Sequence, residues 1–183
     1  MSKKNGGKAS LADPSSLDPF KGSEKDLVRV VIETPKGSRN KFAFDPKEHI
    51  LELKRVLPSG MTFPCDFGFI PSTIAGDGDP IDVLVLMDEP AFPGCVLKCR
   101  LIGVMEGEQV EKKKKDRNDR LIAVEQGAHS WSDIKTVDDL GKKFTRELEA
   151  FFVNYHNLSG KKYRVLAMKG PEQARKLIKS GMR

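Results

Sequence analysis

Three carboxylates crowd into the short segment Gly76–Val83, where glycines and a proline favour a tight turn. The acids are Asp77, Asp79 and Asp82. Because closely spaced ionised acids repel one another, a fold that keeps all three charged needs a compensating cation. A ligand set made only of oxygens favours a hard ion, Mg²⁺ or Mn²⁺ before Zn²⁺. The alternatives are an acidic surface turn and an EF-hand loop. The EF-hand does not fit, because Ile81 stands where that loop needs an acid or amide.

Further charged residues accompany the early apolar segments. Glu33 ends the first of these segments, Lys41 begins the second and Arg55 lies in the third. Lysine and arginine close to divalent cations suit a phosphate ligand, because the metal and the basic groups share its negative charge. Each residue alone is more often an ordinary surface charge. Their combination with the acidic turn favours a phosphate site.

The composition describes a globular protein with an extensive charged surface. Its 183 residues suffice for one well-buried domain, with 38% hydrophobic and 32% charged residues. A net charge of +6 and a pI near 9.2 permit binding of nucleic acid or of a small polyanion. Three cysteines without metal-site spacing indicate reduced thiols and a cytoplasmic protein. No apolar run is long enough for a bilayer, and the N-terminus lacks the apolar core of a signal peptide.

The elements that must position these residues are mostly short strands. We expect a flexible arm over residues 1–25, which are poor in apolar side chains, and a single domain over 26–183. The stretches 58–71 and 107–120 are predicted to be loops, the second because it offers almost nothing to bury. β-Branched and alternating segments predict strands at 27–33, 41–45, 50–57, 81–87, 96–105, 121–124 and 161–168.

Two helices are predicted near the end of the chain. The first begins with a capping-box-like sequence at Thr136 and stops near Gly160, and the second covers 171–179 with a proline at its first position. Many short strands followed by late helices indicate an α+β protein, in which a small β-barrel has the helices packed outside.

The acidic turn belongs to a longer resemblance. The segment Asp77–Val83 resembles the Asp-x-Asp-Pro-x-Asp signature of the family I soluble inorganic pyrophosphatases. The resemblance covers residues 27–183. Further segments follow in the family's order: Val31–Lys41, Phe63–Ile70, Pro93-Gly94, Arg100, Gly103-Val104, Leu121–Val124 and Phe151-Phe152-x-x-Tyr155.

The resemblance implies a five-stranded OB-like barrel and Mg²⁺-dependent hydrolysis of pyrophosphate to two phosphates, with Mn²⁺ or Co²⁺ as possible replacements. In that family two metal ions make hydroxide available near neutral pH. Bacterial members are usually homohexamers. The matching positions imply that Asp77 and Asp82 hold metal, with Asp82 bridging two ions, and that Asp79 accepts the proton of the attacking water. The remaining implied roles are an outer metal-linked acid, Glu33, and phosphate-binding or catalytic groups, Lys41, Arg55 and Tyr155.

Several positions depart from the family pattern. Ala43 replaces a second glutamate, and Phe63 and Phe67 replace tyrosines. Asn118 stands at an acid position, which leaves Asp116 or Asp119 as replacement metal ligands if the loop changes register. These departures predict a working enzyme with an altered metal or pH optimum.

Two basic positions also differ, because Arg120 and His156 replace family lysines. Both are candidates for binding the substrate. A neutral imidazole attracts a phosphate less than a lysine does, so we expect binding at His156 to strengthen as the pH falls toward the titration range of histidine.

Two other functions compete with hydrolysis. The departures suggest a weakened relative that binds phosphate compounds, although three crowded acids have no physical purpose in a site without catalysis. The pI and the run Lys112–Lys115 suggest a nucleic-acid-binding barrel. The sequence disfavours nucleic acid, because no aromatic side chains for base stacking lie near the lysines and the acidic turn would repel a phosphate backbone.

Overall fold

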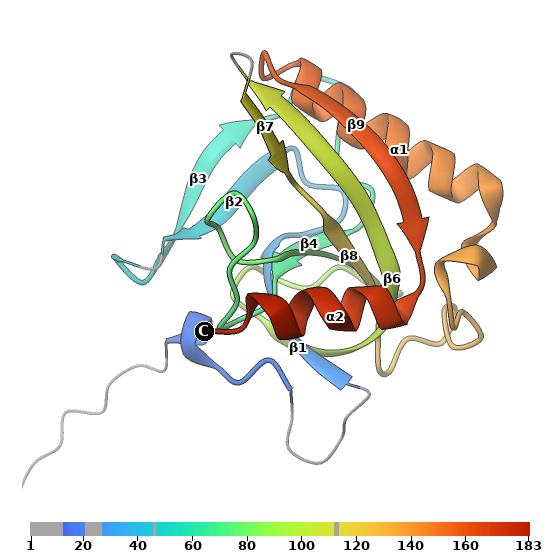
Figure 1. The fold of residues 1–183 in the computed structure, drawn as a ribbon. Coiled ribbons are helices and arrows are strands. Elements are labelled where there is room, and N and C mark those ends of the chain that lie inside the picture. The colour runs from blue at the N-terminus through green and yellow to red at the C-terminus, as the bar shows by residue number, and fades with distance from the viewer. Residues whose placement is uncertain (1–12, 21–26, 46, 112–113) are drawn as a thin grey trace, which may run out of the picture.

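The computed structural model describes residues 13–20, 27–45, 47–111 and 114–183 (Figure 1). Most of the predicted N-terminal arm and the first two lysines of the lysine run lie outside the described residues. The described part is a sheet-rich α+β fold with two α-helices, which confirms the predicted fold class. None of its helices is long and apolar enough to cross a membrane.

The elements follow one another with short connections. The strands are β1 Leu27–Thr34, β2 Asn40–Asp45, β3 Ile50–Val56, β4 Asp66–Phe69, β5 Asp82–Leu86, β6 Val96–Glu111, β7 Lys114–Arg117, β8 Arg120–Glu125 and β9 Lys162–Lys169. The helices are the 3-10 turns η1 Pro14–Ser16 and η2 Val137–Leu140 and the α-helices α1 Gly141–Asn157 and α2 Pro171–Gly181.

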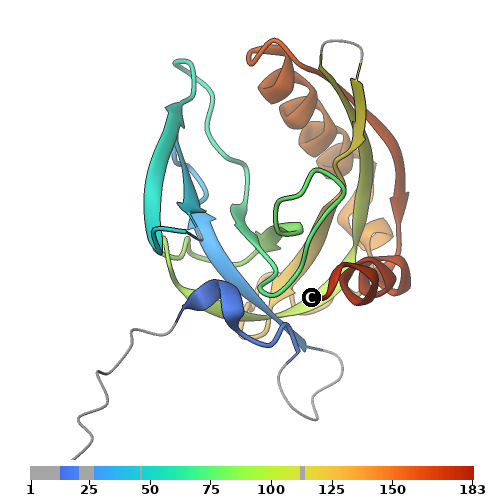
Figure 2. The same ribbon diagram turned by 60° about the vertical axis from the view of Figure 1, so that its left-hand side comes forward.

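The main sheet has seven strands, and its pairings return to their starting point. β1 is hydrogen-bonded to β4 on one side and to β6 on the other, with β5 and β8 completing the ring. β7 and β9 also pair with β6, and β5 runs parallel to β8. β2 and β3 form a separate hairpin. Figure 2 shows this hairpin on one side of the molecule and α1 with β9 on the opposite side.

Two apolar clusters hold the layers together. One lies beneath α1, where Leu148 and Phe152 meet the aromatic side chains Phe63 and Phe67. The other lies between the strand ring and α2, whose Ile178 is fully buried. The buried apolar residues of α1, Leu148, Phe152 and Tyr155, recur at helical spacing and form its inner face.

The structure contradicts the second predicted loop and places a short strand within the first. β4 lies inside 58–71, and its four residues are all buried. The stretch 107–120 is largely a hairpin, because β6 continues to Glu111 and β7 returns along it. Charged side chains form ion pairs across the hairpin: Lys115 Nζ lies 3.7 Å from Glu108 Oε1. An exposed hairpin stabilised by backbone bonds and charge pairs carries no apolar pattern, which is why the sequence concealed it.

Part of the predicted arm contacts the domain. Phe20 forms a bridge with Val28 of β1. Ser72 binds the same segment twice, donating its N–H to the Ser15 carbonyl at 2.8 Å and its hydroxyl to the Leu17 carbonyl at 3.0 Å. Residues 13–20 thus lie against the rim of the domain.

Gly68 allows β4 to approach β1, and a side chain there should destabilise the fold. A Cβ at Gly68 would lie 2.0 Å from the Val31 carbonyl oxygen, which is backbone and cannot move aside. We expect Gly68→Ala to lower the free energy of unfolding by about 2 kcal/mol or more, measured by urea denaturation. Gly127→Ala is the matched control, because its nearest neighbour is the flexible carboxylate of Glu125 at 3.3 Å. Equal stability of the two variants would mean that β4 and β1 can move apart at little cost.

Candidate active site

One cleft, with a volume of about 1110 Å³, opens between the acidic turn, the β2–β3 hairpin and the C-terminal end of α1. Residues far apart in the sequence therefore meet around a single space. Nine of the predicted site residues line it: Glu33, Lys41, Arg55, Asp77, Asp79, Asp82, Arg120, Tyr155 and His156.

The acidic turn is closed by its own backbone. The Gly78 N–H donates to the Ala75 carbonyl at 3.1 Å, and the Ala75 N–H donates to the Asp79 carbonyl at 2.7 Å. The Asp79 N–H also lies 3.3 Å from Asp77 Oδ1. Gly78 has a φ of +94°, which glycine adopts without the steric cost of a side chain. Local backbone geometry thus fixes the first two acids immediately before Asp82 begins β5.

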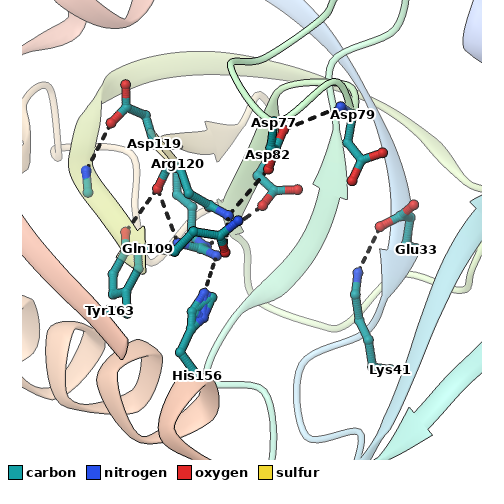
Figure 3. A network of polar contacts seen from close by, with 12 residues as sticks. Glu33, Lys41, Asp77, Asp79, Asp82, Gln109, Asp119, Arg120, His156 and Tyr163 are labelled. Carbon is teal, nitrogen blue, oxygen red and sulfur yellow. Dashed lines mark hydrogen bonds and ion pairs between the residues drawn. The ribbon is translucent and has the colours of Figure 1, made fainter. Parts of the chain in front are cut away.

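Asp82 and Arg120 are neighbours because β5 and β8 run parallel. Val83 pairs with Leu121, so the residues before them lie together at the N-terminal ends of the two strands. Arg120 Nε is 3.8 Å from Asp82 Oδ2. The strand register therefore places a buried cation beside the last acid of the turn (Figure 3).

Desolvation makes the acids of the cleft harder to ionise. Burial raises the pKa of Asp82 to about 7, even though Arg120 and Lys41 act to lower it. Burial also raises the pKa of Asp77. A nearby cation stabilises the charged form of such carboxylates. The cleft is therefore electrostatically suited to a divalent ion.

The donors suit a hydrated ion better than a closed cage of protein ligands. Among the residues that the structure describes, no three Asp, Glu, His or Cys side chains lie close enough to share one ion. Mg²⁺ commonly binds one or two carboxylates and completes its shell with water and substrate phosphate oxygens. Asp77 and Asp82 lie next to each other and can supply those carboxylates (Figure 3). The residues present fit such an ion together with a phosphate compound.

The opposite wall carries two of the predicted phosphate-binding groups. Lys41 and Arg55 are cross-strand partners in the β2–β3 hairpin. Lys41 Nζ lies 2.9 Å from Glu33 Oε2 and 4.0 Å from the centre of the Phe67 ring. The Arg55 guanidinium lies 4.0 Å from the centre of the Tyr155 ring. Ion-pair and cation–π contacts thus restrict both cations at the edge of the cleft.

The structure contradicts the predicted pH behaviour of His156. The residue is 5% exposed. Burial, with contributions from Arg120, Arg55 and Lys161, lowers the pKa of His156 to about 3. The imidazole is therefore neutral across the range where the sequence predicted it to titrate. The expectation that it strengthens binding toward acid pH is wrong, because a histidine enclosed beside cations does not take up a proton there.

The structure does not bring Asp116 or Asp119 to the cleft. Asp119 Oδ1 accepts a hydrogen bond from the Gly107 N–H at 2.9 Å and lies 2.8 Å from Arg117. Asp116 pairs with Lys114 at 3.0 Å within β7. Both carboxylates have partners on the hairpin. The change of loop register that would have made one of them a metal ligand is not present.

Asn118 occupies the cleft side of this segment instead. Its Nδ2 donates to Gln109 Oε1 at 3.1 Å and lies 3.3 Å from Asp77 Oδ2. An amide therefore satisfies a carboxylate oxygen where a second acid would have repelled it. The other departures in the acidic and aromatic walls also line the cleft: Ala43, Phe63 and Phe67.

The sequence missed several residues that line the cleft. Gln109 was hidden in a stretch predicted to be a loop. Ser159 accepts a hydrogen bond from Arg55 Nη1 and donates one to the Tyr155 carbonyl at 3.1 Å. Ser159 lies in the turn after α1, two residues beyond Asn157, so helical spacing does not identify it. Lys161 also lines the cleft, but nothing in its surroundings in the sequence marked it.

The geometry agrees with comparisons to known proteins. The inorganic pyrophosphatase family profile matches residues 30–183. The inorganic pyrophosphatase of Methanosarcina mazei is 38% identical over 156 residues, covering 85% of this chain and 90% of that protein. That of Aquifex pyrophilus is 40% identical over 169 residues, covering 91% and 93%. The crystal structure of the Thermus thermophilus inorganic pyrophosphatase matches with a TM-score of 0.85 and 33% identity, covering 93% of this chain and 97% of that one. This chain belongs to the inorganic pyrophosphatase family.

Proposed function

We propose that this protein hydrolyses inorganic pyrophosphate to two phosphates with Mg²⁺ as its cofactor. The observation that carries the proposal is that an acidic turn and a basic wall face each other across one cleft. A doubly charged metal and a polyanion are complementary to such a pair of walls. Membership of the inorganic pyrophosphatase family supports the same reaction.

The basic wall would bind the phosphates. Lys41 and Arg55 are charged groups whose side chains are already restricted by their neighbours. Ordering them before binding reduces the entropy lost when the substrate arrives. Tyr155 supports Arg55, and Arg120 closes the opposite end of the cleft beside Asp82. We assign these groups to substrate binding, and Lys41 and Arg55 also to neutralising charge on the departing phosphate.

The acidic wall would hold the metal and activate water. Bound Mg²⁺, or Mn²⁺ or Co²⁺ in its place, supplies positive charge that acidifies water and stabilises the leaving phosphate. Asp77 and Asp82 would bind this ion, and burial raises the pKa of both carboxyl groups. Asp79 is an exposed acid of the same turn, and we assign it to accept the proton of the attacking water. Glu33 fixes Lys41 at the side of the cleft.

A weakened phosphate-binding protein is the second candidate. Asn118 beside Asp77 is the observation that favours it, because an amide in place of an acid lowers the negative charge available to metal. Ala43 removes another carboxylate from the same space. Hydrolysis is the better supported function, since the three acids of the turn and the two cations facing them are all present.

Several wider properties belong to the same proposal. The ring of five paired strands supports an OB-like barrel, and residues 26–183 act as a single pyrophosphatase domain. We propose a homohexamer, as in bacterial members of the family. The cysteines Cys65, Cys95 and Cys99 are free, which supports a reducing compartment such as the cytoplasm.

Asp79→Asn should abolish most of the pyrophosphate hydrolysis. The substitution removes the proposed proton acceptor while keeping the size of the side chain. We expect kcat to fall by about 10²–10⁴-fold with Mg²⁺, measured as phosphate release. Asp133→Asn is the control, because that exposed acid lies outside the cleft. Full activity of Asp79→Asn would refute the role given to Asp79.

Mg²⁺ should stabilise the fold through Asp82. A ligand at one hundred times its Kd adds about 2.7 kcal/mol to the free energy of unfolding. We therefore expect the wild-type Tm to rise by several degrees when Mg²⁺ replaces a chelator. Asp82→Asn should lose most of that rise, because the metal loses a charged ligand. A rise of the same size in both proteins would place the ion elsewhere.

Asn118→Asp should destabilise the metal-free protein and tighten the binding of metal. In a chelator, the new carboxylate would face Asp77 in place of a hydrogen-bond donor, which costs about 1–3 kcal/mol. With Mg²⁺, the added charge should tighten binding by roughly tenfold, measured by calorimetry. Asn154→Asp, on the exposed part of α1, is the control. Unchanged Mg²⁺ affinity in Asn118→Asp would show that the amide does not limit metal binding.

A further inference from the structure

Arg120 is enclosed almost completely by protein. Its residue is 2% exposed, and its guanidinium carbon lies 4.3 Å from the centre of the Phe152 ring and 4.8 Å from that of Tyr163. A buried guanidinium is stable only if its N–H groups have acceptors. Among the described residues, Arg120 Nε is a buried side-chain nitrogen without a hydrogen-bond partner. One edge of this cation is therefore left without an acceptor.

The other two nitrogens of the guanidinium, Nη1 and Nη2, contact protein acceptors. Arg120 Nη1 lies 3.4 Å from the Asn118 carbonyl, which also accepts from the Tyr163 hydroxyl at 3.1 Å. Arg120 Nη2 lies 3.2 Å from His156 Nε2. Arginine only donates hydrogen bonds, so Nε2 must be the acceptor, and the imidazole proton must lie on Nδ1.

The imidazole is itself fixed in orientation. The Tyr163 ring meets the His156 ring edge-on, with centres 4.6 Å apart and planes at 86°. The guanidinium is planar, so fixing Nη1 and Nη2 determines where Nε points. It points toward Asp82 Oδ2, 3.8 Å away, at the cleft (Figure 3).

We propose that His156 is a positioning residue for Arg120. It accepts from Nη2 so that the unpartnered Nε–H of Arg120 is presented to a phosphate oxygen of the substrate beside Asp82. His156 itself then makes no bond to the substrate. The inference rests on the proposed function for its substrate, but the contact between His156 and Arg120 is a property of the protein alone.

The charges around His156 agree with this role. The cations that face it are Arg120 from β8, Arg55 from β3 and Lys161, which precedes β9, while Tyr155 and Tyr163 contribute phenol rings. Burial and these cations lower the pKa of His156 to about 3. The acceptor lone pair on Nε2 is therefore preserved at neutral pH. A protonated imidazole could not accept from Arg120.

The first test reads the proton on the imidazole directly, without turnover. Side-chain ¹⁵N NMR of the full chain distinguishes the two neutral tautomers of each of the three histidines. We expect His156 to carry its proton on Nδ1 and to show no titration between pH 5 and 8. His49 and His129, both exposed, serve as internal controls for assigning the signals. A proton on Nε2, or titration of His156 in this range, would overturn the proposal.

The second test is a double-mutant cycle on pyrophosphate hydrolysis. His156→Phe keeps a ring but removes the acceptor, and we expect kcat/KM to fall by about tenfold or more. In the Arg120→Lys background the same change should alter kcat/KM by less than about twofold, because a lysine has no second edge to be oriented. Equal losses in both backgrounds would mean that His156 acts on the substrate independently of Arg120, and would overturn the proposal.

Two further variants protect this cycle against misreading. His156→Gln restores an acceptor and should recover most of the lost activity, whereas a purely structural role for the ring would make His156→Gln more impaired than His156→Phe. His129→Phe should match the wild type, since that histidine is exposed and lies outside the cleft. If the wild type releases no phosphate at all, the proposed function fails, and the tautomer measurement still decides whether His156 positions Arg120.

Discussion

Charge balance in a partly desolvated cleft is the constraint on which the other features of the site depend. Ionisation of Asp82 is unfavourable in this position, because burial raises its pKa. Strand register provides part of the compensating charge. β5 and β8 run parallel, so their first residues place a carboxylate and a guanidinium side by side. The ring of strands, the β2–β3 hairpin and α1 then bring the remaining cations and aromatic rings to the same space. A divalent ion would complete a balance that protein groups only partly achieve.

Much of this arrangement could be predicted from the sequence. The acidic turn was readable because glycines and a proline dictate its backbone, and α1 because its apolar residues recur with helical spacing. The prediction failed at two strand segments, for different reasons. β4 contains a glycine whose purpose is visible only beside β1. The β6–β7 hairpin is charged on its exposed side chains and is held by backbone bonds, so its residues resemble a loop.

The site shows the same division. Residue types and order, together with the family resemblance, identified nine of the cleft residues. Protonation and orientation could not be read in this way. His156 looked like a group that titrates, yet burial and the cations Arg120, Arg55 and Lys161 lower its pKa. Asp119 is next to Asn118 in the chain, but it bonds to the Gly107 N–H while Asn118 lines the cleft. Such facts depend on three-dimensional surroundings and have no local signature.

β6 has a consequence for how the molecule is made. It is 16 residues long and pairs with β7 and β8, which follow it closely, and with β1 and β9, which lie far from it in the chain. Contacts so distant in sequence order slowly, and the partners that emerge last during synthesis include β9. The end of α1, with Tyr155 and His156, emerges only shortly before it. The cleft therefore gains the wall formed by α1 only after the strands β1 to β8 have been made.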